Sequence, residues 1–484
     1  MSTPKKKTAP AHVVSYPRKI AWGLGGLTND MVNALWVLAM PIFSVGLGVS
    51  AAWIGLALAL PRVWDMITDP LMGHISDNTR SRYGRRRPYI FFGAIGLGVS
   101  FALIWMPSPE WSETMLLTWF IGTSLLFFTF LTMWNIPWTA LGLELTPDVQ
   151  ERNGVQAVRS WFATGAAFII PMIMPLAFRF GDGDEVDGVR TLGWVVGGIM
   201  TLCAIAAALF CKEPSATATV AATATVAAKA APKISFWKSA KYTFKDSRFI
   251  GLCIYASLFC GGILLVGQMG YYINVFYVYG ALPIQEAKEA ASNVMFWGGM
   301  VGGLSNLAAI PLIVWTANRF GKKPTLLIGV LIVAIGQSIK WFFFIPEDPY
   351  LQVWLSIIIY PGIILTWTLI PSMMADICDF DELETGHRRE GMYSATFAWL
   401  LKVGVTIAMA LSGWLINVAG IVDVADVQTP DAIFNMRLLF TLLPTIFVII
   451  GGCFILRYPI TEKDAERVKE QLAERHAATA EAQA

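Results

Sequence analysis

Twelve apolar segments recur along the chain, and most are long enough to cross the hydrocarbon core of a bilayer as an α-helix. Polar and charged residues gather in the short stretches between them, so the pattern predicts an all-α polytopic membrane protein with twelve transmembrane helices. The apolar segments lie near residues 20–46, 51–78, 88–107, 113–143, 155–178, 191–211, 249–279, 291–317, 324–345, 350–375, 392–419 and 434–456.

The composition agrees with this pattern. Hydrophobic residues make up 55% of the chain and charged residues only 14%, whereas a soluble domain carries about 25% charged residues. The mean hydropathy is +0.56. The net charge of +2 gives no reason to expect a nucleic-acid partner. None of the six cysteines forms a C-x-x-C pair, so neither a zinc site nor a disulfide framework is predicted, and no cofactor is expected.

The distribution of lysine and arginine predicts the orientation in the membrane. Of the 36 such residues, 28 lie in the termini and in the loops on their side, four lie on the opposite side and four lie within helices. The positive-inside rule therefore places both termini in the cytoplasm. We expect a multi-pass protein of a plasma membrane, in particular a bacterial inner membrane, with the lipid bilayer as a partner.

The two halves of the chain resemble each other at an offset of 237 residues. The run "RYGRR" at 82–86 corresponds to "RFGKK" at 319–323, and Glu144 and Arg152 correspond to Asp381 and Arg389. The chain therefore reads as two pseudo-symmetric six-helix halves in parallel orientation. Transporters of the major facilitator type are built in this way, with the substrate site between the halves. The predicted parts are a cytoplasmic tail 1–19, half 20–211, linker 212–247, half 248–457 and a cytoplasmic tail 458–484.

Three charged residues lie in the middle of the apolar segment 51–78. Arg62, Asp65 and Asp69 have the spacing i, i+3 and i+7, which places them on one helix face. Each charge would cost ~2.5–3.5 kcal/mol at the bilayer centre, so a polar cavity is expected in front of them. Two carboxylates this close resist ionising together, and either a proton or a hard cation such as Na⁺ would relieve the repulsion. The alternative is an Arg62–Asp65 pair that only stabilises packing.

Other charges fall at similar membrane depth in other segments. Asp30 lies about 11 residues into the first segment, Lys402 lies in the eleventh, and Arg159 lies near the cytoplasmic start of the fifth. A carboxylate facing a cavity could accept hydrogen bonds from the hydroxyl groups of a polar substrate. The equal alternative is that Asp30 pairs with Arg159 or Lys402 and locks the halves together.

The loop "RSRYGRRRP" holds a dense cluster of arginines that fixes topology. It is also a candidate gate, in which the arginines pair with acidic residues near the cytoplasmic surface and release them when the carrier opens. The alternative is that the loop only fixes the topology and does not act as a gate. The candidate gating residues are Arg82, Arg85, Arg86, Arg87, Glu144, Asp376 and Asp379.

Three stretches of the sequence are similar to one transporter family. "RVWDMITDPLMGHISDNTRSRYGRRRP", "NIPWTALGLELTPDVQERNG" and "MMADICDFDELETGHRREGMYSATFAWLLKVG" resemble the glycoside–pentoside–hexuronide:cation symporters, the melibiose-carrier family of the major facilitator superfamily. The resemblance runs through the chain apart from the linker and tails. It implies a cation-coupled importer of a sugar or glycoside, with no enzymatic activity.

The resemblance also implies roles for single residues. Asp65 and Asp69 match the cation-site carboxylates, and they would ligate a metal only if the coupling ion were Na⁺. Thr132 matches a hydroxyl near the cation. The residues implied for binding the sugar are Asp30, Arg159, Trp367 and Lys402.

The sequence departs from the family pattern at two positions. Asn135 stands where the Na⁺-coupled melibiose carrier has an aspartate, and Thr139 stands where that carrier has a tryptophan that stacks on the sugar. Losing one acid at the cation site favours H⁺ over Na⁺ as the coupling ion.

Three alternative functions are open: a carrier of another solute such as a lysophospholipid, an intramembrane enzyme, and a transport-inactive sensor. The sequence contains no H-E-x-x-H, G-x-S-x-G or nucleotide-binding P-loop motif.

Overall fold

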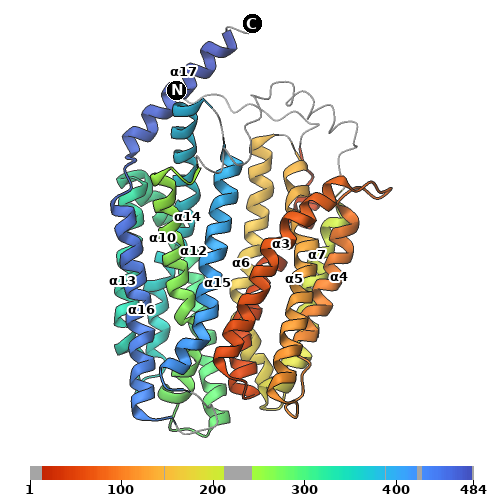
Figure 1. Ribbon diagram of the computed structural model, residues 1–484, viewed down its shortest axis with the longest axis vertical. Helices are drawn as coiled ribbons and strands as arrows, with labels where there is room; N and C mark the ends of the chain where they lie inside the picture. The colour runs from red at the N-terminus through yellow and green to blue at the C-terminus, as the bar shows by residue number, and fades with distance from the viewer. Residues whose placement is uncertain (1–12, 147, 212–242, 387–388, 422–427, 482–484) are drawn as a thin grey trace. The chain divides into compact units, whose positions relative to one another are not determined.

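The computed structural model describes residues 13–146, 148–211, 243–386, 389–421 and 428–481, and these residues confirm the all-α class (Figure 1). Ten of their helices are long and apolar enough to cross a membrane. Two further helical stretches, 16–46 and 51–78, are apolar but carry charged residues in their interiors. Within the described residues the total therefore reaches the twelve predicted segments.

The chain divides into two compact units. Unit 1 comprises residues 1–228, 288–296 and 422–427, and unit 2 comprises 229–287, 297–421 and 428–484. The predicted linker falls mostly on residues 212–242, which lie outside the described residues. The domain boundaries taken from the sequence stay a prediction.

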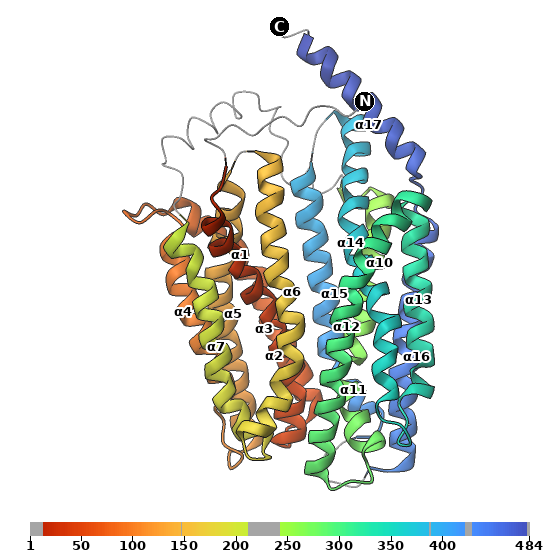
Figure 2. The ribbon, with the colours of Figure 1, turned by 180° about the vertical axis from the view of Figure 1, so that it is seen from behind.

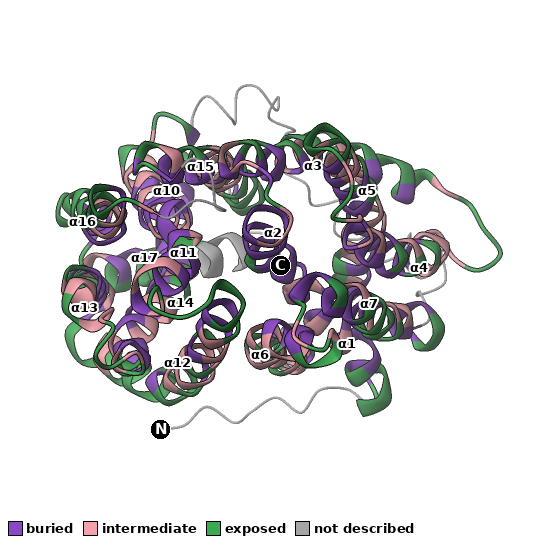
Figure 3. Ribbon diagram, turned by 90° about the horizontal axis from the view of Figure 1, so that it is seen from below, coloured by how far each residue is buried: buried purple, intermediate pink, exposed green. Residues whose placement is uncertain are grey.

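Unit 1 consists of helices that pack along their lengths. Helix α4 lies at the outer edge of the unit in Figure 1 and contacts both α5 and α7, and Figure 2 shows α1 beside α6. The short α2 is mostly buried (Figure 3), and a π-helical turn, η2, follows it. The elements are α1 (Tyr16–Met31), α2 (Asn33–Ala39), η2 (Met40–Gly46), α3 (Ala51–Asn78), α4 (Arg87–Ile104), α5 (Glu113–Glu144), α6 (Val149–Phe180) and α7 (Glu185–Phe210).

Unit 2 repeats this order of elements. Helix α10 contacts α15 and α16, and α13 contacts α14 and α16. Its elements are α10 (Ser247–Gly267), α11 (Met269–Ile273), η3 (Asn274–Val278), α12 (Ile284–Phe320), α13 (Lys322–Phe343), α14 (Leu351–Thr385), α15 (Glu390–Val418), α16 (Pro430–Leu456) and α17 (Glu462–Glu481). The first segment of each unit thus continues through a short α-helix into a π-helical turn, at nearly equivalent repeat positions.

Several helices run beyond the apolar segments that predicted them. Asp148, Asp184 and Asp246 each accept a backbone N–H of the first turn, so α6, α7 and α10 begin in polar sequence. Helix α14 has 35 residues, a length of ~52 Å against a hydrocarbon core of ~30 Å. Its last turns therefore extend beyond the hydrocarbon thickness, and several of their acidic residues are buried against neighbouring helices.

The C-terminal helix α17 covers that projecting end of α14. Ala465, Val468 and Leu472 share one face of α17 and are buried. Thr461 and Asp464 form a capping box: the Thr461 hydroxyl accepts the Asp464 N–H at 3.3 Å, and the Asp464 carboxylate accepts the Thr461 N–H at 3.2 Å. Hydrogen bonds from Thr461 hold the pKa of Asp464 below its usual value. The charged tail predicted after residue 458 is thus a packed helix.

Candidate functional site

Two carboxylates of α3 share one hydroxyl group from α5. Thr132 Oγ1 lies 2.9 Å from Asp69 Oδ1 and 3.3 Å from Asp65 Oδ1, and its side chain and that of Asp65 are buried. Thr68 adds a second hydroxyl, 3.3 Å from that of Thr132. The structure therefore brings together Asp65, Asp69 and Thr132 as a cluster of oxygen atoms inside a membrane-length helix pair.

Prolines shape α3 around this cluster. Pro61 precedes Arg62 and Pro70 follows Asp69, and both lie inside the helix. A proline removes the hydrogen bond to the carbonyl four residues earlier, so the Met66 carbonyl loses its helical partner. That carbonyl lies between Asp65 and Asp69 in sequence, and it adds a polar acceptor to the same stretch of helix.

Arg62 is held by aromatic rings as well as by a carboxylate. Its guanidinium carbon lies 4.6 Å from the ring centre of Trp36 and 5.4 Å from that of Phe128. Its Nη1 lies 3.7 Å from Asp65 Oδ2, which is a loose ion pair. The pairing considered from the sequence is therefore present. The carboxylates and hydroxyl groups of the cluster offer the oxygen donors that a proton or a hard cation needs.

A chain of amide hydrogen bonds leads from α5 to Asp30 on α1. Asn135 Nδ2 donates to Asn29 Oδ1 at 2.6 Å, and Asn29 Nδ2 donates to Asp30 Oδ1 at 2.9 Å. Asn135, expected from the sequence at the cation cluster, thus donates to Asn29 and is connected to the Asp30 carboxylate only through that residue. The position keeps a link between α5 and α1 without adding a negative charge.

Arg159 lies at a close approach of α1 and α6. A Cβ built on Gly26 would lie 2.4 Å from the Arg159 carbonyl oxygen and 3.0 Å from its Cγ. Gly26 is one turn before Asp30, so the absence of a side chain there brings Arg159 towards the Asp30 region. The Arg159 guanidinium lies 5.3 Å from the ring centre of Trp138.

Tryptophans brace this part of unit 1. The rings of Trp22 and Trp138 stack at 5.1 Å, and those of Trp134 and Trp138 stack at 4.9 Å. Trp22 and Trp138 also donate their indole N–H groups to each other's carbonyl oxygens, both at 3.0 Å. Thr139, the residue beside Trp138, is exposed. The tryptophan on this turn of α5 therefore supports Arg159 from the buried side.

Two of the predicted binding residues belong to unit 2. Trp367 on α14 is 39% exposed, which is uncommon for a large aromatic side chain unless it faces lipid or a cavity. Lys402 on α15 is half-buried. Each is described within its own unit, and their roles in binding stay predictions.

The arginine loop of unit 1 is paired within that unit. Arg86 is buried and bridges Asp77 at 2.8 Å and Glu144 at 2.7 Å, and Arg85 also pairs with Glu144. Arg87 donates to the carbonyl of Ala208 at 2.6 Å, at the end of α7. Arg82 is exposed, and its guanidinium lies 4.7 Å from the ring centre of Tyr83.

The acidic end of α14 is likewise paired within unit 2. Asp376 is buried and binds Lys322, at the start of α13, and Lys469 of α17 at 3.2 Å. Asp379, three residues further on, is half-buried. The gating role predicted for Asp376 and Asp379 stays a prediction, whereas the ion pairs of Asp376 join α13, α14 and α17.

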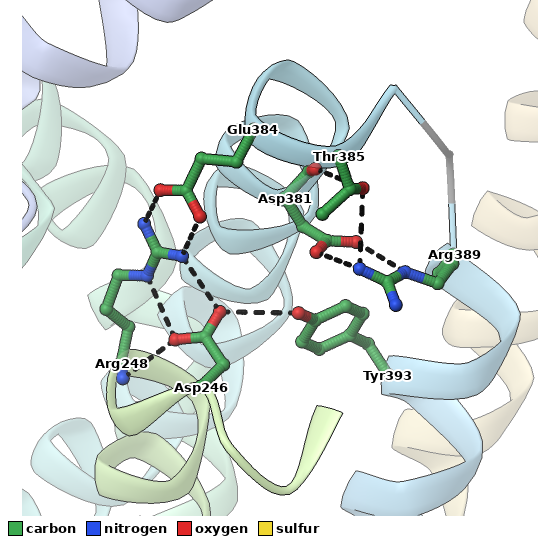
Figure 4. Close-up of polar contacts among 7 residues, drawn as sticks. All are labelled: Asp246, Arg248, Asp381, Glu384, Thr385, Arg389 and Tyr393. Carbon is green, nitrogen blue, oxygen red and sulfur yellow. Dashed lines mark hydrogen bonds and ion pairs between the residues drawn. The ribbon is translucent and has the colours of Figure 1, made fainter. Parts of the chain in front are cut away.

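A second ion-pair network at this end joins α10, α14 and α15 (Figure 4). Arg248 donates to Asp246 at 2.9 Å and to Glu384 at 2.8 Å, and Tyr393 donates to Asp246 at 3.3 Å. The remaining ion pair of the network joins Arg389 to Asp381, and both side chains are buried. Of this network, the sequence repeat had identified only Asp381 and Arg389.

The donor set defines which cations the site suits. Among the residues that the structure describes, no group of three or more His, Cys, Asp or Glu side chains is arranged to hold a metal ion. Two carboxylates with neighbouring hydroxyl oxygens suit a proton or a hard monovalent cation better than a transition metal.

A protein-family model described as MFS/sugar transport protein matches residues 21–462. The chain belongs to this family. The match confirms the resemblance to the melibiose-carrier-like symporters and the predicted fold, and it places the protein among transporters rather than enzymes.

Individual relatives match almost end to end. The inner membrane symporter YicJ of Escherichia coli is 27% identical over 477 residues, with 96% of each chain covered. The isoprimeverose transporter of Lactiplantibacillus pentosus is 26% identical, with 89% of this chain and 85% of the relative covered. The sodium-dependent lysophosphatidylcholine symporter 1 of Xenopus tropicalis is 21% identical, with 97% and 92% covered.

Solved structures establish the same fold. The xylose transporter XylE from E. coli, in a partially occluded inward-open conformation, superposes with a TM-score of 0.62 at 13% identity and covers 93% of this chain and 98% of its own. At that identity the likeness is one of fold alone.

Sequence reasoning missed three residues that this sugar transport family member places at the site. Thr68 adds a hydroxyl to the carboxylate cluster, Asn29 connects Asn135 to Asp30, and Trp138 supports Arg159. Each had a local signal: Thr68 follows Asp65 by three residues, Asn29 adjoins Asp30, and Trp138 follows Trp134 by one helical turn. None of these signals identifies the partner on the other helix.

Proposed function

We propose that this family member is a cation-coupled symporter that imports a sugar or glycoside by alternating access, and that its coupling ion is H⁺. The observation that carries the proposal is the pair Asp65 and Asp69 around the Thr132 hydroxyl, with Arg62 as the nearby cation. Two carboxylates this close together in a low-dielectric site resist ionising at the same time, and binding a proton or another cation would relieve their repulsion.

Proton coupling fits this donor set better than sodium coupling. A proton on either carboxylate converts it from an acceptor into a donor, and neighbouring oxygens are placed to accept. A sodium ion would need several oxygen ligands, and the third acid of the melibiose-carrier pattern is replaced by Asn135. The Asn135 amide donates to Asn29. If the ion were Na⁺, Asp65 and Asp69 would still be its charged ligands.

The solute side of the proposal rests on Asp30 and Arg159. A carboxylate that accepts and a guanidinium that donates are complementary to sugar hydroxyl groups. Trp367 would offer an aromatic face and Lys402 a donor from unit 2, as the family resemblance implies. The relatives named as an inner membrane symporter and an isoprimeverose transporter support an inner-membrane location and a glycoside substrate.

Purified protein in proteoliposomes tests the coupling ion. A pH gradient and a Na⁺ gradient are imposed separately, and uptake is measured for a panel of labelled mono-, di- and uronic sugars. We expect one sugar to accumulate under the pH gradient alone. Asp65→Asn and Asp69→Asn should each abolish accumulation, while Asp187→Asn, a matched change at an exposed ion pair of α7, should not. Full accumulation by Asp65→Asn would refute the coupling site.

Equilibrium exchange separates binding from coupling. Asp30→Asn should lower the apparent affinity for the sugar in counterflow, which needs no ion gradient. Unchanged affinity would refute the solute role of Asp30. Failure of every sugar to enter under either gradient would favour the carrier of another solute, and uptake of a lysophospholipid would then be measured, given the sodium-dependent lysophosphatidylcholine relative. No counterflow of any solute would favour a sensor.

A further inference from the structure

A groove runs along the exposed face of α13 and α16 in unit 2. It encloses about 590 Å³. Figures 1 and 3 show the two helices as neighbours, and Figure 3 shows exposed residues on both. Both helices are membrane-length, so this groove opens where a bilayer would supply hydrocarbon.

Small residues form its floor and large ones its rim. Gly452 lies so close to α13 that a Cβ there would meet Val330 at 2.7 Å. Leu331 and Leu456 are 59% and 60% exposed. The hydroxyl of Ser338 is turned onto the Ala334 carbonyl at 2.8 Å, so the lining is apolar along its length. An apolar groove of this kind fits a hydrocarbon chain.

One end of the groove is basic. Leu456 is the last residue of α16, and Leu327 lies in the second turn of α13. Lys323 Nζ donates to the Leu456 carbonyl at 2.9 Å and to the Tyr458 carbonyl at 2.6 Å, which fixes its charge at this end. Arg457 follows Leu456 directly and is exposed.

The acidic side chains Asp376 and Glu462 near this end contact lysines other than Lys323. Asp376 binds Lys322 through its side chain, and Glu462 accepts the Lys322 N–H at 3.4 Å. Lys323 and Arg457 therefore present two positive charges next to an apolar groove, at the membrane end that the charge distribution predicts to be cytoplasmic.

We propose that this groove is a binding site for an anionic phospholipid, with an acyl chain along α13 and α16 and the phosphate at Arg457 and Lys323. Basic pockets between transmembrane helices at the cytoplasmic side bind anionic head groups. A zwitterionic lipid offers the same chains, but its head group carries a compensating cation. The site lies within unit 2 and is independent of the proposed sugar transport.

Native mass spectrometry of the purified full-length protein tests the head-group contact. Phosphatidylglycerol and phosphatidylcholine with identical chains are titrated, and the bound lipids are counted. Arg457→Gln should weaken phosphatidylglycerol binding roughly fivefold, the effect of one basic residue near a charged surface, and should leave phosphatidylcholine binding unchanged. The double change Lys463→Gln and Arg467→Gln, at exposed positions of α17, is the control for charge. Unchanged phosphatidylglycerol binding by Arg457→Gln would overturn the proposal.

Filling the groove tests the acyl-chain contact. Cys453 lines the groove and is exposed, so Cys453→Trp should occupy the space and reduce phosphatidylglycerol binding at least as much as Arg457→Gln does. Ile407→Trp, at an exposed apolar position on α15, is the matched control and should have no effect. Equal lipid binding by wild type and Cys453→Trp would overturn the proposal. The proposal would also be overturned if the protein formed a dimer without bound lipid and Cys453→Trp dissociated that dimer, because a second copy of the chain would then cover the groove.

Discussion

The two units place an acidic residue at the same repeat position but give it different partners. Glu144 and Asp381 are 237 residues apart and each lies at the end of a long helix, α5 or α14. Glu144 is bound by Arg85 and Arg86, from the loop before α4. Asp381 is bound by Arg389, at the start of α15. The repeat therefore conserves the charge, while the helices that the charge joins differ.

One additional carboxylate explains the difference. Lys322 and Lys323 occupy the positions of Arg85 and Arg86 in unit 2. Lys322 binds Asp376, whose counterpart in unit 1 is the uncharged Thr139, and Lys323 binds carbonyls at the end of α16. Both lysines thus have partners other than Asp381. Arg389 binds Asp381, whereas its counterpart Arg152 donates to the Thr146 carbonyl at 3.3 Å.

The largest effect is expected from breaking the more buried of these pairs. The side chains of Asp381 and Arg389 are each 7% exposed, against 26% for Glu144 and 32% for Arg85. Asp381→Asn leaves a buried guanidinium without its counter-charge and should cost about 3 kcal/mol. Glu144→Gln should cost about 1 kcal/mol, because solvent reaches Glu144 and Arg85 and the buried Arg86 keeps its ion pair with Asp77. Thermal inactivation midpoints of the purified protein measure both.

A double substitution sharpens this test. Asp381→Asn combined with Arg389→Gln removes the unpaired charge and should recover part of the loss. Asp187→Asn, at a pair that solvent reaches, is the control and should change the midpoint little. If Glu144→Gln lowered the midpoint as far as Asp381→Asn, burial would not explain the difference between the units.

The second largest effect is expected when a residue of unit 1 is replaced by the residue at the equivalent position of unit 2. Gly26 corresponds to Ile263 of unit 2 at the same offset. Gly26→Ile would push a side chain against the Arg159 carbonyl, where even a Cβ would lie at 2.4 Å. Separating α1 from α6 should cost ~1–3 kcal/mol and displace Arg159 from the Asp30 region. Sugar counterflow should fall more than tenfold.

Gly122→Ala provides the matched control for that exchange. A Cβ at Gly122 would meet no atom within 4 Å, so this substitution should leave counterflow unchanged. Retained sugar affinity in a folded Gly26→Ile variant would mean that the close approach of α1 and α6 is not what positions Arg159.

Hydrophobic periodicity was sufficient to predict the twelve segments, because burial in lipid dominates where each helix crosses the membrane. It underestimated the length of helices whose ends are polar, such as α14, because capping and ion pairs extend these helices beyond the hydrocarbon. Intramembrane charge identified Asp65, Asp69 and Asp30 as candidates. Partner choice was not predictable: Asn135 donates to Asn29, and Glu144 and Asp381 select different cations, because side-chain geometry decides between donors of similar chemistry.

The smallest effect concerns the two lysines that share Asp376. The Lys322 side chain is 18% exposed and that of Lys469 is 53% exposed. Lys322→Gln should therefore lower the thermal midpoint more than Lys469→Gln, whose solvent-screened pair contributes ~0–1 kcal/mol. Lys469→Gln should instead raise hydrogen exchange in the first turns of α17 by about twofold, since it loosens the contact with α14, and Lys463→Gln should not.

Equal midpoints for the two variants would show that Lys469 of α17 stabilises Asp376 as much as Lys322 does. The main role of Asp376 would then be to hold α17 against α14. It would no longer explain why the ion pairs of unit 2 differ from those of unit 1.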